Sequence, residues 1–238
     1  MKNIIAGITA EFNPLHKGHE LLIKSQKINN DAIVIILSSN FTQRGEASFI
    51  DKFLRAEMAI KAGADLVLEL PFIFACSAAQ DFARGAVNIA ARTGFINKIA
   101  FSMEDPKFDF NKLINLEENQ DYKNFLRHEL SLGASFSKAH AVSAEKILPG
   151  SFEFLSKPNN LLGLSYINEI KKNNYALKFD FIKREGNFKS KAIRGDFEKN
   201  SDMLPDYSRE ILLKAREAGR ISNQEKFTEL TRALKIYF

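Results

Sequence analysis

Short apolar segments alternate with helical patterns along most of the chain, and this alternation limits the fold more than any other feature. The apolar segments are rich in β-branched residues and have no polar face, as expected of strands buried inside a sheet. They lie at 3–9, 31–39, 65–70, 98–102 and 177–183. Helical patterns lie at 18–27, 51–62, 77–93, 122–132, 137–147 and 161–173. Helices between strands predict parallel crossovers, and hence an α/β fold with a doubly wound parallel sheet.

The composition places the chain among ordinary globular proteins. Of its 238 residues, 45% are hydrophobic and 26% are charged, which excludes disordered, collagen-like and coiled-coil classes. The single cysteine, Cys76, excludes a disulfide framework and a cysteine-built zinc site, and it suits a reducing cytoplasm. No apolar run approaches the roughly 20 residues that span a bilayer. We therefore expect a cytoplasmic protein with no membrane partner.

Positive charge is concentrated toward the carboxyl end of the chain. Segment 171–238 holds 16 Lys and Arg against 10 Asp and Glu, whereas the rest is nearly neutral. Such an excess favours an anionic partner, although a solvated helix face is the ordinary alternative. After Pro205 the pattern changes to two helices without strands, at 206–218 and 223–237. We expect a main domain over 1–204 and the start of a helical region over 205–238.

The most informative motif directly follows the first predicted strand. Residues 11–19 read Glu-Phe-Asn-Pro-Leu-His-Lys-Gly-His, which puts His16 and His19 three residues apart at the opening of a helix. Free backbone N–H groups and the helix dipole favour phosphate there, and the imidazoles can add donors. Gly18 lets a ligand approach the backbone closely. The alternative is a pair of surface histidines; two histidines with one distant cysteine are too few for zinc.

The motif at 16–19 is the signature of the nucleotidyltransferase superfamily, which includes the class I aminoacyl-tRNA synthetases. Four further segments resemble the bacterial tRNA(Met) cytidine acetate ligase family. They read FTQRGE at 41–46, KAGADLVLELP at 61–71, FARGAV at 82–87 and KPNNLLG at 157–163. The resemblance extends over nearly the whole chain to about residue 205. It implies a Rossmann-like nucleotidyltransferase core.

The resemblance also implies an activity. The family uses ATP to activate acetate as acetyl-adenylate and transfers the acetyl group to the exocyclic amine of the wobble cytidine of elongator tRNA(Met). ATP, with Mg²⁺ carried on its phosphates, acetate and the anticodon loop are then the expected partners. The implied catalytic residues are His16, His19 and Arg184. The implied ATP-binding residues are Thr9, Ala10, Glu11, Phe12, Asn13, Pro14, Leu15, His16, Lys17, Gly18, His19, Glu20, Leu21, Leu22, Ser102, Asn159 and Arg184.

The sequence departs from the family pattern at two places. Ser102 stands where the family usually has glycine, and the run at 189–194, Lys-Ser-Lys-Ala-Ile-Arg, replaces a Ser/Thr-rich run. Lys191 and Arg194 are therefore candidate phosphate contacts. The family also continues through a C-terminal helical domain. With only 205–238 in its place, we expect intact adenylate formation but weak, salt-sensitive tRNA binding.

Other polar residues were assigned from their positions in the predicted elements. Arg44 follows the second strand and is a candidate to bind a carboxylate or phosphate. Glu69 ends the third strand; it either contacts Mg²⁺, a ribose or the cytidine amine, or caps the next helix. We expect Asp81 and Arg84 to pair on one helix.

His128 and His140 lie in charged helical contexts, so we expect both at the surface. No metal site is expected. Two other functions remain open: adenylylation of a small phosphorylated metabolite, or a degenerate module that binds ATP or RNA without catalysis.

Overall fold

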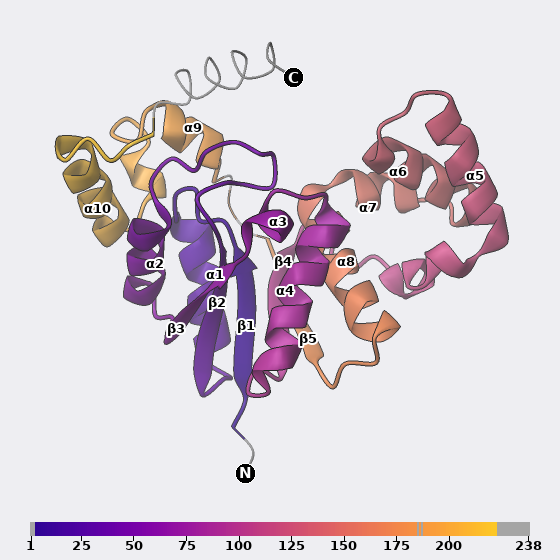
Figure 1. Ribbon diagram of the computed structural model, residues 1–238, viewed down its shortest axis with the longest axis horizontal. Coiled ribbons are helices and arrows are strands. Elements are labelled where there is room, and N and C mark those ends of the chain that lie inside the picture. Colours follow the sequence, from indigo (N-terminus) through magenta and orange to yellow (C-terminus); the bar gives the residue numbers. More distant parts are fainter. Residues whose placement is uncertain (1–2, 185, 187, 223–238) are drawn as a thin grey trace.

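Five parallel strands form the centre of the molecule. The computed structural model describes residues 3–184, 186 and 188–222. The strands are β1 (Ile5–Ala10), β2 (Ala32–Ser38), β3 (Leu66–Leu70), β4 (Lys98–Met103) and β5 (Lys178–Lys183), in the order β3-β2-β1-β4-β5 (Figure 1). All five predicted strands and the doubly wound topology are confirmed. The sheet grows outward in both directions from β1 and β4, so their carboxyl ends form the switch point where such sheets bind ligands.

Helices connect the strands and form a separate group beside the sheet. The longer ones are α1 (Lys17–Lys27), α2 (Lys52–Lys61), α4 (Ala79–Thr93), α5 (Gln120–Ser131), α6 (Phe136–Ile147), α8 (Pro158–Lys172) and α10 (Asp206–Glu217). Each was predicted with similar bounds. The short helices α3 (Phe72–Ala75), α7 (Ser151–Ser156) and α9 (Ser190–Gly195) were missed, because one or two turns give no readable period. The helix predicted at 223–237 lies outside the described residues.

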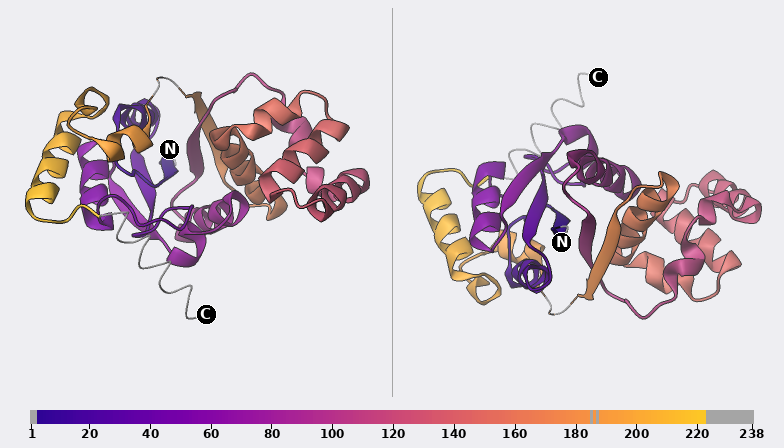
Figure 2. Two further views of the ribbon diagram at one scale, coloured as in Figure 1. Left: turned by 90° about the horizontal axis from the view of Figure 1, so that it is seen from above. Right: turned by 90° about the horizontal axis from the view of Figure 1, so that it is seen from below.

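Alternate residues of the strands supply two hydrophobic cores. In β2, Ile33, Ile35 and Leu37 pack with α1, α2, α9 and α10, whereas Val34 and Ile36 belong to the core under α3, α4 and α8. Side chains alternate between the faces of a strand, so an uninterrupted apolar run covers both. Figure 2 shows the sheet between these two helical layers.

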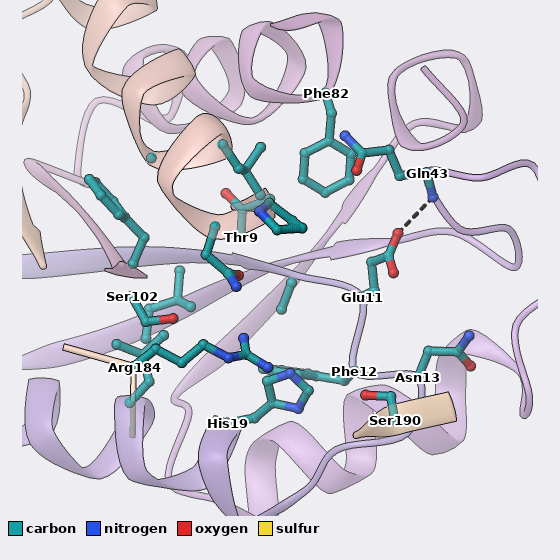
Figure 3. Close-up of a pocket in the computed structure, with 18 of the residues that line it drawn as sticks. Thr9, Glu11, Phe12, Asn13, His19, Gln43, Phe82, Ser102, Arg184 and Ser190 are labelled. Atoms are coloured by element: carbon teal, nitrogen blue, oxygen red, sulfur yellow. Dashed lines mark hydrogen bonds between the residues drawn. The ribbon is translucent and has the colours of Figure 1, made fainter. Parts of the chain in front are cut away.

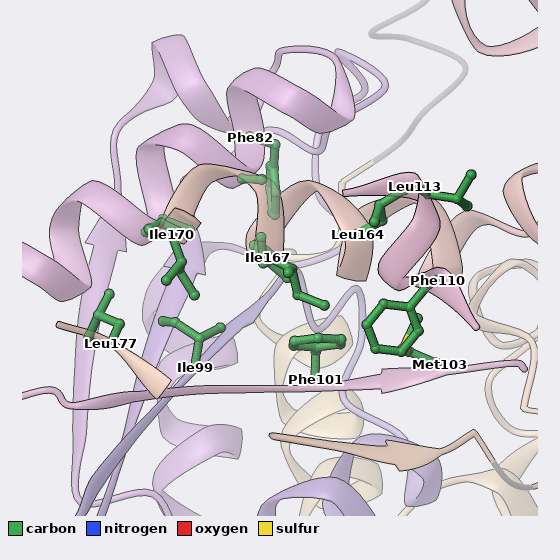
Figure 4. Packing of buried hydrophobic residues seen from close by; sticks show 14 of the residues in the cluster. Phe82, Ile99, Phe101, Met103, Phe110, Leu113, Leu164, Ile167, Ile170 and Leu177 are labelled. Atoms are coloured by element: carbon green, nitrogen blue, oxygen red, sulfur yellow. The ribbon is translucent and has the colours of Figure 1, made fainter. Parts of the chain in front are cut away.

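A helical lobe of α5, α6 and α7 extends from the second layer. Phe110 and Phe154 join it to the core that contains Phe101 and Met103 (Figure 4). His140 of this lobe is buried, contrary to prediction, and its Nδ1 forms a hydrogen bond with the buried hydroxyl of Tyr122. The charged neighbours of His140 in sequence lie on other faces of α6, and periodicity alone did not identify the face that it occupies. His128 is exposed, as predicted.

The segment after residue 204 packs against the sheet layer. Ile211 and Leu212 of α10 join the core beneath α2, and Arg220 pairs with Asp51 at 2.7 Å. The predicted domain division at residue 204 stays a prediction.

The predicted Asp81–Arg84 pair is present, at 2.9 Å. Among the described helices, none has the length and apolar character that crossing a bilayer requires.

Candidate active site

A cavity of about 250 Å³ opens at the carboxyl ends of β1 and β4 (Figure 3). Its walls come from β1 and the segment after it, β4, α8, and the chain around α9. The polar side chains that line it are Thr9, Glu11, Asn13, His19, Gln43, Ser102, Asn159, Tyr166, Arg184, Ser190 and Arg194. The predicted switch point is therefore hollow and lined by groups that can donate or accept hydrogen bonds.

The two histidines of the motif form one unit at the start of α1. Their rings stack with centroids 3.6 Å apart, and the backbone N–H of His16 donates to Nδ1 of His19 at 3.3 Å. Phe188 stacks on the outer side of His16, and Phe12 packs against His19. His16 is the N-cap residue of α1, so the pair lies beside the free N–H groups of the first turn. The prediction that both imidazoles share one side of the helix start is confirmed.

Both imidazoles are held neutral by their surroundings. Burial and, to a smaller extent, the positive charge of Arg184 together lower the pKa of His16 to about 4. Loss of hydration, His16 and Arg184 together hold the pKa of His19 well below its ordinary value. Each ring therefore offers one N–H donor near neutral pH, and Arg184 supplies the positive charge.

Gly18 is fixed by its neighbours. A Cβ there would lie 2.8 Å from Cδ2 of Phe188 and 3.2 Å from Cε1 of His16. A side chain at this position would displace the His16–Phe188 stack. Close packing around the two imidazoles thus gives a reason for this glycine in addition to ligand approach.

The predicted ATP-binding residues divide into three groups. Thr9 to Asn13, His19, Leu22, Ser102, Asn159, Arg184 and the candidate Arg194 line the main cavity. His16, Gly18 and Leu21 line a small adjoining hollow that shares His19, Ser102 and Arg184 with it. Pro14, Leu15, Lys17 and Glu20 line neither; Leu15 is fully buried, and Glu20 pairs with Lys24 at 2.8 Å.

Three candidates lie outside both hollows. Lys191 and Arg44 are exposed, and Glu69 pairs with Lys52 at 2.6 Å. Because β3 is an edge strand, its carboxyl end lies away from the β1–β4 switch point. The turn closed by the Gly45 N–H bond to the Thr42 carbonyl turns Gln43 toward the cavity and Arg44 to the surface. These three residues line neither hollow, and their contacts with a ligand stay predictions.

Sequence reasoning missed Gln43 and Tyr166 as cavity residues. The backbone N–H of Gln43 donates to Oε1 of Glu11 at 2.6 Å, while its side-chain Nε2 is buried without a partner among the described residues. Tyr166 is 2% exposed, and burial raises the pKa of its hydroxyl, which lies beside the Thr9 hydroxyl. Gln43 lies in the FTQRGE segment, directly after the second strand, and this position could have identified it. The charge of Arg44 favoured that residue as the ligand contact instead.

Arg55 fixes the loops around the cavity. It is fully buried, and its guanidinium donates to the backbone carbonyls of Glu11 at 2.6 Å and Ile50 at 3.2 Å, and to that of Ser39. Burial lowers its pKa to about 10, so it stays charged at neutral pH. The ends of β1 and β2 are thereby tied to α2. Across the cavity, Arg194 donates to the Asn13 carbonyl at 3.0 Å.

Within the described part of the chain, no group of three or more His, Cys, Asp or Glu side chains could hold a metal ion. The cavity is instead lined by amide, hydroxyl, imidazole and guanidinium groups around a single carboxylate, Glu11. This set is suited to binding an anionic ligand through hydrogen bonds and charge.

Comparisons with known proteins agree with this geometry. A protein of Fervidobacterium nodosum named tRNA(Met) cytidine acetate ligase is 36% identical over 238 aligned residues, which cover 91% of this chain and 56% of that protein. A protein of the same name from Mesomycoplasma hyopneumoniae is 43% identical and is matched over 77% of this chain and 58% of its own length. The chain thus spans somewhat more than half the length of these curated relatives.

A solved structure also matches this chain closely. The crystal structure of Thermotoga maritima TmcAL bound with alpha-thio ATP has a TM-score of 0.82 and 34% sequence identity, and the match covers 92% of this chain and 57% of that one. The family model described as HIGH Nucleotidyl Transferase matches residues 1–235, which include the histidine turn and all five strands. The chain belongs to the HIGH nucleotidyl transferase family.

Proposed function

We propose that the chain activates acetate with ATP to form acetyl-adenylate and then transfers the acetyl group to the wobble cytidine of elongator tRNA(Met). The observation that carries this proposal is the stacked His16–His19 pair, with Arg184 beside it, at the switch point of the sheet. The similarity to proteins named tRNA(Met) cytidine acetate ligase supports the choice of acyl group and acceptor.

In the first step, an acetate oxygen attacks the α-phosphorus of ATP and pyrophosphate leaves. Negative charge grows on the phosphate oxygens, and the N–H groups of His16 and His19, the Arg184 guanidinium and the first turn of α1 are placed to neutralise it. Neutral imidazoles suit this task because they donate without a proton having to be gained or lost. Magnesium carried on the triphosphate, and not held by a protein site, would supply further positive charge to these phosphate oxygens.

The nucleoside half of ATP is assigned to the α8 side of the cavity. Ser102 lies near the carboxyl end of β4 there, and Asn159 at the start of α8 is held by the bond from its Nδ2 to Glu104 Oε1, at 2.6 Å. A serine in place of the family's glycine adds a hydroxyl beside this subsite and leaves the cavity open.

In the second step, an anticodon loop presents an unstacked cytidine to the adenylate. A cytoplasmic location and salt-sensitive contacts between the basic residues of 171–238 and the RNA backbone are part of this proposal.

Acetate-dependent exchange of labelled pyrophosphate into ATP tests the first step, and mass spectrometry of tRNA for acetylcytidine tests the second. Exchange that depends on a phosphorylated metabolite and not on acetate would favour the adenylylating alternative. ATP binding without any exchange would favour the non-catalytic one.

A further inference from the structure

Glu11 is the one carboxylate that lines the described cavity, and one of its oxygens is left free. Oε1 accepts the backbone N–H of Gln43 at 2.6 Å, and the main-chain carbonyl of Glu11 accepts a bond from Arg55. Oε2 has no hydrogen-bond partner among the described residues. The side chain is therefore held from two directions while Oε2 stays available to a ligand.

The Gln43 amide lies at the same end of the cavity. Its Nε2 is buried and unpaired among the described residues, a state that costs free energy unless a ligand supplies an acceptor. In Figure 3, Glu11, Gln43 and Phe82 lie toward one end of the cavity, and Ser102 and Arg184 lie toward the other. An acceptor and a donor thus lie at the same end of the cavity, away from the groups assigned to phosphate and nucleoside.

This pair matches one edge of cytosine. The exocyclic N4 amine of cytosine is a donor and its N3 is an acceptor, whereas uracil presents the opposite order. A carboxylate that accepts from N4 and an amide that donates to N3 fit cytosine and reject uracil. Phe82, which is 2% exposed, walls the same end with an apolar ring.

We propose that Glu11 and Gln43 bind the Watson–Crick edge of the acceptor cytosine, and that Glu11 Oε2 takes the proton released when the N4 amine is acetylated. This inference rests on the proposed function. The N4 nitrogen forms a bond to the acetyl carbon, the bond from that carbon to the AMP phosphate oxygen breaks, and AMP leaves with the electron pair. The N4 proton passes to Glu11 Oε2. Glu11 thereby takes the role that the sequence had offered to Glu69.

The surroundings of Glu11 suit a group that must accept and later release a proton. Burial raises its pKa above the ordinary value, and the Gln43 N–H together with the charges of Arg55, Arg194 and Arg44 opposes that rise. These groups face it from the loop after β2, from α2 and from α9. A base whose pKa lies closer to neutrality than that of a free carboxylate is the more effective one.

The decisive variant is Glu11→Gln, which retains an oxygen for the Gln43 N–H and removes the negative charge. Hydroxylamine traps acetyl-adenylate as acetohydroxamate without needing a base, so it reports the first step alone. Because Glu11 also belongs to the segment expected to bind ATP, the informative quantity is the ratio of the two steps. We expect acetylcytidine formation to fall on the order of 10²- to 10⁴-fold more than exchange and hydroxamate formation, which is the usual contribution of a general base. Glu46→Gln, an exposed change in the loop that carries Gln43, is the matched control and should leave both steps unchanged.

Recognition of the cytosine base can be measured separately from acetyl transfer. Two synthetic anticodon stem-loops that differ only in cytidine or uridine at the wobble position are added to the hydroxylamine assay. The cytidine stem-loop should block trapping by the wild-type chain more strongly than the uridine one, and Glu11→Gln should remove the difference. Equal inhibition by both stem-loops in the wild type would overturn the inference, whether or not acetyl transfer is detected.

Failure of the inference and failure of the proposed function give different results. If Glu11→Gln abolishes exchange while the wild type keeps it, Glu11 serves ATP or acetate, and the inference is overturned with the proposed function intact. If transfer to cytidine by Glu11→Gln matches wild type, the inference is again wrong. If the wild type shows no acetate-dependent exchange, the proposed function fails and the inference fails with it.

Discussion

Two regions of the molecule bury a histidine and hold it neutral, but the partners of the two histidines differ. Burial lowers the pKa of His16 in the turn after β1 and of His140 in the helical lobe to about 4 in each case. His140 is bonded to Tyr122 and packs against Phe136. The His16–His19 pair instead lies at a hollow lined by Gln43 Nε2, which is unpaired among the described residues, and by the arginines Arg184 and Arg194.

A shifted pKa therefore does not identify a functional site by itself. In the lobe, His140 Nδ1 and the Tyr122 hydroxyl satisfy each other, and the lowered pKa of His140 reports only burial. At the cavity, some hydrogen-bond donors and charged groups have no partner among the described residues, and these groups are available to a ligand. The two sites should therefore respond differently to the same kind of substitution.

The largest effect is expected at the cavity. Replacing both His16 and His19 with Ala should reduce acetate-dependent pyrophosphate exchange on the order of 10⁴-fold, if each lost donor costs on the order of 10²-fold as at other charge-stabilising sites. Exchange rates measured at saturating ATP and acetate check this. Circular dichroism should show an intact fold, and exchange close to the wild-type rate would refute the assignment of the two histidines.

The lobe should lose stability and keep activity. His140→Ala leaves a cavity and an unpaired Tyr122 hydroxyl, so the free energy of unfolding should fall by about 2–4 kcal/mol. Tyr122→Phe keeps the packing and should cost less. Urea unfolding gives both values. Exchange per folded molecule should match wild type, and a large loss of exchange in folded Tyr122→Phe would erase the contrast between the two regions.

A third prediction uses pH to compare the two histidines directly. Because the folded pKa values lie below the ordinary value of 6.5, the unfolded chain binds more protons between pH 6.5 and about 4, and stability must fall as pH is lowered through that range. At pH 5 each histidine should contribute a loss of about 2 kcal/mol. Urea unfolding from pH 7 to 5 measures the slope; His140→Gln should flatten it, and an unchanged slope would show that His140 is not held neutral.

The smallest effect is expected at Lys191. The structure places this side chain at the surface and outside both hollows. Lys191→Ala and Lys191→Thr should each change the KM for ATP by less than about twofold, since a solvated lysine that contacts no ligand contributes little. Steady-state exchange kinetics test this, and a severalfold rise in KM for Lys191→Ala would restore it as a phosphate contact.

Much of the fold could be read from the sequence because its strands carry strong local patterns. The five apolar runs predicted five buried strands, and the histidine turn after the first of them predicted the position of the cavity. The single-turn helix α9 could not be read from periodicity, although it brings Ser190 and Arg194 to the site. Glu69 and Arg44 line neither hollow for a different reason. Each follows a strand, but only the strand order decides which carboxyl ends meet, and that order is a long-range property.

Arg55 has a consequence for how the site meets its ligands. Its bonds to the carbonyls of Glu11, Ser39 and Ile50 make the cavity walls part of the same cooperative unit as the central strands. The loops at the switch point are then already ordered before a ligand arrives, so little binding energy is lost in freezing them. The buried guanidinium of Arg55 thus links the rigid sheet to the loops around the cavity, and this link favours ligand binding because the loops need no further ordering.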